Sequence, residues 1–296
     1  MLLEYKTCPV CSGTEFQNYI TLKDHSISGE TFNISMCKSC EFKFTNPIPS
    51  EETIGKYYQS ENYISHSDTN KGIVNKLYHL VRKQSLKSKV ALINKSTNNK
   101  KGIVLDIGCG TGYFLQACKE NGWKIEGMEP DSIARQQAEK NTNQTVFTDL
   151  FTIKEEGKYD VITLWHVLEH VHKLNESIQH IHKLLKPNGT LIIAVPNCLS
   201  YDSATYKEFW AAYDVPRHLY HFTQTDMDKL LKKHKFTKTA IKPMLFDSFY
   251  VSMLSDKYKY EKTNYLRSFI NGLVSNFKGS ASNNYSSLIY IFKRND

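Results

Sequence analysis

The chain has 296 residues with 40% apolar and 23% charged residues, which is the composition of an ordinary globular protein, and its net charge is +8. This length suits one large domain with a smaller one, and it excludes a miniprotein in which the seven cysteines act as disulfide staples. The N-terminus has no basic start followed by an apolar run, and no segment approaches the roughly 18 apolar residues of a membrane span. We therefore expect a soluble protein of the cytoplasm.

The first 50 residues predict a zinc-binding module. Four of the seven cysteines form two Cys-x-x-Cys pairs separated by 25 residues, Cys8 with Cys11 and Cys37 with Cys40. Each pair can form a turn that presents two thiolates, and two such turns complete a tetrahedral zinc site. Four protein ligands leave no open position, so the metal should be structural, and a module this small needs it to fold. Unrelated core cysteines are the alternative.

Residues 51–100 predict a helical, basic linker. Apolar residues recur at helical spacing from Ile73 to Ile93, which predicts an amphipathic helix with its lysines outward. Residues 71–101 contain nine Lys or Arg and no acid, whereas residues 1–50 carry a net charge of −1. The basic segment is either a solvated helix face or a surface for an anionic partner, such as a diphosphate-linked substrate or a membrane face.

Residues 101–296 predict an α/β domain, because apolar strands and helices alternate along them. Strands are expected at 102–108, 124–129, 145–148, 159–165, 190–195 and 287–292, and helices at 113–121, 132–140, 175–185 and 226–234. Repeated strand–helix units predict a parallel sheet with helices on both faces and a ligand beyond the carboxyl ends of the strands. Residues 240–286 are weakly periodic and predict no particular element.

A glycine-rich loop is the most informative segment. The strand in Val104–Gly112 reaches Asp106 and is followed by Gly108, Gly110 and Gly112. Glycines at these positions let the backbone turn tightly and approach a ligand closely. A dinucleotide fingerprint needs its third glycine one position later, which argues against a nicotinamide cofactor.

Two further acids define the expected ligand. Glu129 ends the next strand, 23 residues after Asp106, where a carboxylate can accept both hydroxyls of a ribose. Asp149 follows the third strand and is placed to meet an adenine amino group. The implied ligand has a ribose and adenine without a phosphate cradle, and acidic neighbours favour cationic amino and sulfonium groups.

Three segments, Val104–Gly112, Ile125–Asp131 and Tyr159–His170, resemble the successive signatures of class I S-adenosylmethionine-dependent methyltransferases. The resemblance covers about residues 100–235. It implies a Rossmann-like, seven-stranded, mostly parallel sheet in which the last strand, Ser287–Phe292, runs antiparallel. The cofactor site that it implies comprises Asp106, Gly108, Cys109, Gly110, Gly112, Glu129, Pro130, Asp149, Leu150, Trp165 and His166. Cys109 is expected as a small turn residue rather than a nucleophile.

The four-cysteine module followed by Tyr57–Tyr63 is similar to the beginning of bacterial deoxysugar C-methyltransferases and related enzymes of surface-polysaccharide clusters. This narrower resemblance implies that Tyr58 and Tyr63 lie over the methionine end of the cofactor. Aromatic packing between domains is the alternative. The acceptor that it implies is a small molecule, either an anionic sugar nucleotide or another glycan-pathway intermediate.

Two histidine clusters could supply a base for methyl transfer. In Trp165–His170, positions 166, 169 and 170 would share one helix face and could also fit a metal. Ubiquinone-pathway O-methyltransferases carry an acidic version of this triplet, whereas the first position here is His. The second cluster is Asp214–Thr223. It falls where the deoxysugar enzymes keep a histidine-rich stretch, although the order of the residues differs. We expect His218 or His221 as the base and Arg217 as a contact for substrate charge, with helix capping and interface packing as the alternative.

Two other functions compete with a small-molecule methyltransferase. An RNA methyltransferase should have a basic zinc ribbon, but this one is slightly acidic, and no Asn-Pro-Pro-Tyr-type signature follows the fourth strand. We therefore expect no nucleic-acid partner. A non-catalytic binding protein with a cofactor fold need not keep Asp106, Glu129 and the glycines. The sequence does not indicate the acceptor atom or the oligomeric state.

Overall fold

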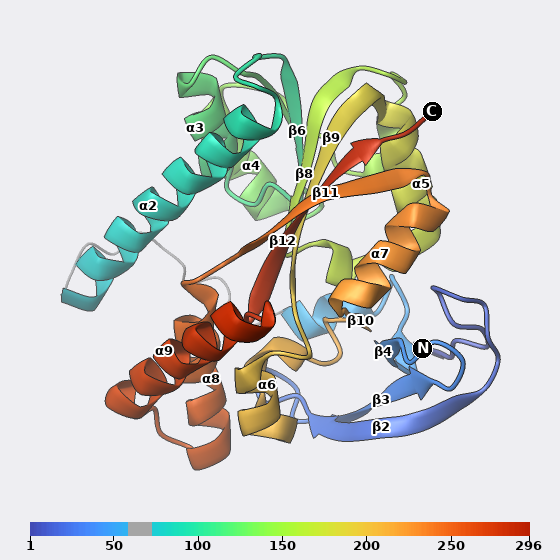
Figure 1. Ribbon diagram of the computed structural model, residues 1–296, viewed down its shortest axis with the longest axis vertical. Coiled ribbons are helices and arrows are strands. Elements are labelled where there is room, and N and C mark those ends of the chain that lie inside the picture. Colours follow the sequence, from blue (N-terminus) through green and yellow to red (C-terminus); the bar gives the residue numbers. More distant parts are fainter. Residues whose placement is uncertain (59–72) are drawn as a thin grey trace.

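A computed structural model describes the backbone of residues 1–58 and 73–296, and side chains within 1–58 and 81–296. Its centre is a six-stranded sheet (Figure 1). The strands are β6 (Ile103–Ile107), β7 (Lys124–Met128), β8 (Tyr159–Trp165), β9 (Leu185–Pro196), β11 (Phe236–Pro243) and β12 (Ser287–Arg294). Their order is β11-β12-β9-β8-β6-β7.

The strand directions confirm the mostly parallel α/β sheet. Strand β6 pairs in parallel with β7 and β8, and β8 pairs in parallel with β9. The last strand, β12, runs antiparallel between β9 and β11. The strand predicted at 145–148 is reduced to a single parallel bridge, in which Phe147 pairs with Met128 beside β7.

Helices cover both faces of this sheet. Two apolar cores result, because side chains of β12 alternate between the faces: Ile289 and Ile291 enter one core, and Leu288, Tyr290 and Phe292 enter the other. The first core lies under α2 (Ile73–Ser96), α3 (Tyr113–Glu120) and α4 (Ser132–Thr142), and the second under α5 (Leu174–Leu184) and α7 (Gln224–Lys233). Helix α7 begins two residues before the prediction because Thr223 and Asp226 form a capping box.

The N-terminal residues form a second, antiparallel sheet. Its strands are β2 (Phe16–Lys23), β3 (Thr31–Cys37), β4 (Lys43–Thr45) and β10 (Tyr220–His221), and a small pair is formed by β1 (Leu2–Leu3) and β5 (Ile48–Pro49). Strand β10 lies far along the chain and pairs with β4. The domain boundaries at residues 50 and 100 stay a prediction, and this strand pairing joins the two predicted domains.

Several short elements follow the strands at their carboxyl ends. They are η1 (Ile54–Tyr58), η2 (Leu150–Thr152), η3 (Leu168–His170), α6 (Tyr201–Tyr206), η4 (Lys207–Phe209) and η5 (Ala211–Tyr213). The segment that the sequence left unassigned forms a helical hairpin, α8 (Asp247–Tyr260) and α9 (Tyr265–Ser282). Figure 1 shows this hairpin and the N-terminal sheet at the same end of the central sheet. Within the described residues, no helix has the length and apolar character needed to cross a bilayer.

Candidate active site

The glycine-rich loop joins β6 to α3 at the carboxyl end of the sheet. Gly108 and Gly110 have φ angles of 68° and 53°, which few residues other than glycine adopt. A Cβ atom on Gly108 would lie 2.5 Å from the side chain of Val167, whereas one on Gly110 would meet nothing within 4 Å. Gly110 therefore borders open space where the sequence predicts the cofactor.

Two buried carboxylates surround this loop. The Oε2 and Oε1 atoms of Glu129 accept the backbone N–H groups of Gly110 at 2.8 Å and of Asp131 at 3.0 Å. The Oδ1 atom of Asp106 accepts the hydroxyl of Thr163 at 2.6 Å. Burial raises the pKa of Asp106 to about 7 and also raises the pKa of Glu129. A cationic ligand beside Asp106 would stabilise its ionised form.

The remaining residues predicted around the loop have different surroundings. The thiol of Cys109 is buried, and burial raises its pKa, so it stays protonated as expected of a turn residue. Gly112, with a φ of 79°, immediately precedes α3. Asp149 is exposed and caps η2, where its Oδ1 accepts the N–H two residues later at 2.7 Å. Leu150 is buried in the core, and Pro130 is exposed.

Trp165 and His166 lie at the carboxyl end of β8. The Nε1 atom of Trp165 is buried without a hydrogen-bond partner among the described residues, and Lys89 Nζ lies 4.3 Å from the centroid of its ring. His166 has a φ of 57°, an uncommon conformation for a non-glycine residue. An unpaired buried donor and an unusual backbone at a strand end together indicate a ligand site. Of the α2 lysines expected to point outward, Lys83 and Lys87 are exposed, whereas the prediction is wrong for Lys89.

The imidazole of His166 lies between two carboxylates. Its Nε2 is 2.9 Å from Asp247 Oδ2, and its Nδ1 is 3.3 Å from Glu169 Oε1. Burial alone would lower the pKa of His166, but the two carboxylates raise it to about 10. The same contacts hold the pKa values of Glu169 and Asp247 below their usual range against the effect of burial. His166 is therefore a cation that joins β8 to the start of α8.

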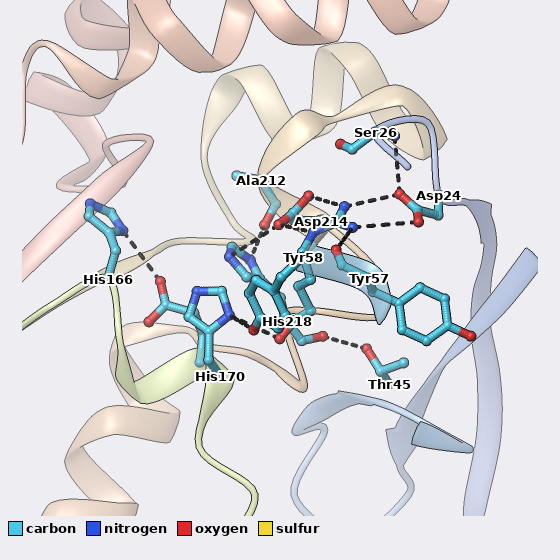
Figure 2. Close-up of polar contacts among 12 residues, drawn as sticks. Asp24, Ser26, Thr45, Tyr57, Tyr58, His166, His170, Ala212, Asp214 and His218 are labelled. Atoms are coloured by element: carbon cyan, nitrogen blue, oxygen red, sulfur yellow. Dashed lines mark hydrogen bonds and ion pairs between the residues drawn. The ribbon is translucent and has the colours of Figure 1, made fainter. Parts of the chain in front are cut away.

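Glu169, His170 and His218 form a second cluster, and Figure 2 shows the two histidines side by side. One potential ligand atom from each lies within 4.8 Å of the others, and the two imidazole rings meet edge to face with centroids 4.6 Å apart. Glu169 Oε2 has no hydrogen-bond partner among the described side chains and backbone. The Nδ1 atom of His218 is 2.9 Å from the carbonyl of Ala212, so it carries the proton and leaves Nε2 with the lone pair in the neutral ring. That Nε2 is 4.0 Å from Asp214 Oδ2.

His170 links this cluster to the N-terminal part of the chain. Its Nδ1 lies 3.0 Å from both Tyr58 Oη and the carbonyl of Arg217. Burial, helped by the nearby His218, lowers the pKa of His170 to about 4, so the ring is neutral. Tyr58 thus contacts a histidine of the cluster, while Tyr63 lies outside the described residues.

Arg217 forms a buried ion-pair network and presents no vacant donor. Its guanidinium contacts Asp214 at 2.8 and 2.6 Å, Asp24 at 3.0 and 3.5 Å and the carbonyl of Tyr57 at 2.8 Å, which accounts for all five N–H donors. The two carboxylates raise the pKa of Arg217 despite its burial, and Arg217 lowers theirs. A contact between Arg217 and substrate would have to displace one of these partners.

His221, the other predicted base, lies inside β10. Its Nε2 is 3.1 Å from the hydroxyl of Thr45, and the ring is almost fully buried. Burial keeps the pKa of His221 well below its usual value. Its surroundings are those of a neutral core histidine.

The four N-terminal cysteines converge. The Sγ atoms of Cys8 and Cys40 are 3.6 Å apart, those of Cys11 and Cys37 are 3.5 Å apart, and all four lie within 4.8 Å of one another. Tetrahedral zinc with Zn–S bonds of about 2.3 Å holds its sulfur atoms roughly 3.8 Å apart. In both pairs the residue after the second cysteine has a positive φ, of 63° and 65°, so the two turns are alike. The geometry of this donor set fits zinc.

A family model described as a methyltransferase domain matches residues 78–241, more than half of the chain. The chain belongs to this methyltransferase family. Ubiquinone biosynthesis O-methyltransferases from Actinobacillus pleuropneumoniae and Pseudomonas aeruginosa are 37% and 30% identical over 106 and 102 residues. These regions cover 32% of this chain and 45% and 44% of the two relatives, so the chain spans a little under half the length of the curated relatives it matches.

Solved methyltransferase structures share the fold. Magnesium protoporphyrin IX methyltransferase from Synechocystis with bound S-adenosylhomocysteine superposes with a TM-score of 0.55 at 18% identity, covering 83% of this chain and 100% of that one. For 1,6-didemethyltoxoflavin-N1-methyltransferase from Burkholderia thailandensis, the TM-score is 0.52 at 14% identity, with 93% and 100% covered. The prediction of a class I methyltransferase is confirmed at the level of family and fold.

Two residues of the candidate site were missed in the sequence. Lys89 belongs to the basic segment, for which the sequence left open a solvated helix face or a surface for an anionic partner, and Asp247 belongs to the segment without periodicity. Both carry charge to the end of β8 from elements distant in sequence. The run of residues without acids around Lys89 could have indicated a role at the site, whereas no sequence feature indicated one for Asp247.

Proposed function

We propose that this protein transfers a methyl group from S-adenosylmethionine to a small-molecule acceptor. One observation carries the proposal: Asp106 lies near the end of β6, and the glycine loop and Glu129 follow β6 and β7. Glu169 and His170 follow β8, the parallel neighbour of β6, and His218 joins them there from the chain beyond β9. Cofactor-binding groups and proton-accepting groups thus share one edge of the sheet, where such folds bind ligands.

The chain's own residues can hold the cofactor in defined ways. Glu129 is fixed by two backbone N–H groups and keeps lone pairs for ribose hydroxyls. Asp106 offers a buried carboxylate to the cofactor's cationic groups, and the indole N–H of Trp165 lacks a partner that a bound ligand could supply. The cofactor supplies an activated methyl group when bound, so the protein mainly aligns an acceptor with it and removes a proton.

We assign His218 as the general base. Its Nδ1 proton is held by the Ala212 carbonyl, which leaves Nε2 as the basic nitrogen. The imidazolium formed on proton transfer would have two carboxylates near it, Asp214 and Glu169. His221 is enclosed in β10, which disfavours the other histidine left open by the sequence. Arg217 positions Asp214 in this scheme instead of contacting substrate charge.

For the acceptor we propose a sugar nucleotide or another glycan-pathway intermediate. The support is the resemblance of the four-cysteine module, the stretch after Tyr57 and the histidine-rich segment to the deoxysugar methyltransferases. The matched relatives are named for ubiquinone biosynthesis, so intermediates of that pathway form the second set of acceptors to test. A cytoplasmic location stays a prediction.

The first test is calorimetric titration of the zinc-loaded protein with S-adenosylmethionine, followed by measurement of S-adenosylhomocysteine with each acceptor set. We expect micromolar binding, and turnover with sugar nucleotides. His218→Asn should retain cofactor binding and lose at least about a hundredfold in kcat, whereas His221→Asn should lose far less. Absence of cofactor binding would overturn the proposed activity, and turnover only with ubiquinone intermediates would overturn the acceptor.

We also propose that Cys8, Cys11, Cys37 and Cys40 hold a structural zinc ion. The matched turns and the sulfur separations support it. Zinc bound there would fix the ends of β2 and β3, and it has no position for substrate because four thiolates complete its shell. Loss of stoichiometric zinc in Cys37→Ser, measured by a colorimetric chelator, tests this assignment.

A further inference from the structure

Helix α9 is amphipathic in the opposite sense to a helix of a water-soluble domain. Its buried positions are small: Ser268, Gly272, Ser275 and Gly279. Its exposed positions include five large apolar residues, Leu266, Phe269, Ile270, Leu273 and Phe277, with Leu266 70% and Phe277 75% exposed. In water the large apolar side chains of a helix normally face the core. A contiguous apolar face of this kind marks an interaction surface.

The α8–α9 hairpin is closed by a seam of small residues. A Cβ atom on Gly272 would lie 2.6 Å from the Phe249 ring and 3.0 Å from its Cα, so only glycine permits this approach. The hydroxyl of Ser248 donates to the Gly272 carbonyl at 3.1 Å, and Ser275 donates to Asp202 at 2.7 Å. Close approach through Gly and Ser with interhelical hydrogen bonds is the packing that helices use in lipid. It leaves the large apolar side chains free to face outward.

Exposed cations outnumber exposed acids in this hairpin. Within residues 245–283, all of which are described, Lys257, Lys259, Lys262 and Lys278 are exposed. Glu261 is the one exposed acid in that range, because Asp256 is buried against Arg267 and Asp247 is half-buried and paired with His166. An apolar face on a hairpin with an excess of exposed lysines is complementary to a bilayer that carries anionic headgroups.

We propose that this face of the α8–α9 hairpin docks on the surface of an anionic lipid bilayer. The hairpin would lie in the interfacial plane with Leu266, Phe269 and Phe277 among the acyl chains and the lysines at the headgroups, without spanning the membrane. A second copy of the chain is the less favourable occupant, because a two-fold contact would bring together two hairpins that both carry excess positive charge.

The docking face reaches the candidate active site. Leu245 and Phe246, both about half exposed, continue the apolar surface to the start of α8. The next residue, Asp247, binds His166 at the end of β8. A docked hairpin would therefore hold the site beside the bilayer, which suits an acceptor attached to a lipid. This last step rests on the proposed methyltransferase activity, whereas the docking itself does not.

Docking is tested by co-sedimentation of the full-length, zinc-loaded protein with vesicles, without cofactor. We expect binding to vesicles containing about one quarter phosphatidylglycerol and much weaker binding to pure phosphatidylcholine. Replacing Leu266, Phe269 and Phe277 together by Gln should lower the partition coefficient at least about tenfold. Changing Lys257 and Lys278 to Glu should lower it roughly fivefold or more for each lysine.

Matched controls come from α4, on the other side of the site. Ile133→Gln changes an apolar residue that is 67% exposed, and Lys140→Glu changes an exposed lysine; neither should alter vesicle binding. Circular dichroism and S-adenosylmethionine titration would show that the variants are folded, and they separate a failed docking proposal from a failed functional one. Equal binding to both vesicle types would overturn the proposal. So would a dimer, seen by light scattering, that the triple Gln variant disrupts while no vesicle binding occurs.

Discussion

Replacing Arg217 by Leu should destabilise the fold rather than impair substrate contact. The guanidinium and the Asp24 carboxylate are 2% and 0% exposed, and Asp214, the second partner, is 24% exposed. Removing one member of a buried pair leaves an uncompensated buried charge, which costs about 3–5 kcal/mol. Because two carboxylates lose their cation, we expect the free energy of unfolding to fall by at least the lower value.

Urea denaturation at neutral pH measures this change, with Lys235→Leu, a surface substitution, as the control. The pH dependence gives a second readout. Arg217 lowers the pKa values of Asp24 and Asp214, so their stabilising contribution is present above the unfolded pKa of about 4 and is lost as pH falls through the lower folded values. The difference between wild type and Arg217→Leu should therefore shrink below about pH 4.

A different outcome for Arg217→Leu would refute this reasoning. If Arg217→Leu unfolds with the wild-type free energy at neutral pH and raises only the KM for the acceptor, Arg217 contacts substrate charge. The buried network would then be incidental to stability, and the reasoning from its five donors would be refuted.

Four further changes test other parts of the structure. Because burial raises the pKa of Asp106 to about 7, affinity for cationic S-adenosylmethionine should rise as pH increases through that value; Asp106→Asn should bind weakly and without this dependence in calorimetric titration. Zinc removal by a chelator, or Cys37→Ser, should lower the melting temperature, and wild type with zinc restored should recover it. Gly108→Ala, which combines a left-handed φ with a 2.5 Å approach to Val167, should cost about 1–3 kcal/mol in urea denaturation. Gly110→Ala meets no neighbour and should weaken cofactor binding more than stability.

The sequence predicted the parts of the fold that depend on local pattern. The boundaries of β8 are as expected, and β6, β7, α3 and α4 differ from the prediction by one or two residues at most ends, because apolar runs and glycines mark them directly. The prediction of a strand at 145–148 was wrong, because a short apolar run does not ensure hydrogen bonding to a neighbouring strand. Of these residues only Phe147 forms a bridge, with Met128 at the edge of the sheet. The local sequence pattern therefore specifies a helix or strand more firmly than it specifies which strands pair.

Part of the candidate site could be predicted where its residues lie on neighbouring elements of the sequence. The glycine loop and Glu129 lie on consecutive elements, and the structure brings them together through the hydrogen bond to Gly110. The role of Arg217 was not predictable, since its partner Asp24 lies 193 residues away. For the same reason the choice between His218 and His221 needed the strand pairing of β10, which only tertiary structure reveals.

The charges at the carboxyl ends of β6, β7 and β8, together with Asp247, bear on how the proposed site would bind S-adenosylmethionine and release S-adenosylhomocysteine. Four carboxylates, two of them paired with His166, outnumber two cations: Asp106, Glu129, Glu169 and Asp247 against Lys89 and His166. A site with this excess of acid favours a sulfonium, and the attraction grows once ligand binding ionises Asp106. Methyl transfer converts the sulfonium to a neutral thioether and removes that attraction. The buried acids that favour cofactor binding should therefore weaken binding of the product, so Asp106→Asn should affect S-adenosylhomocysteine affinity less than S-adenosylmethionine affinity.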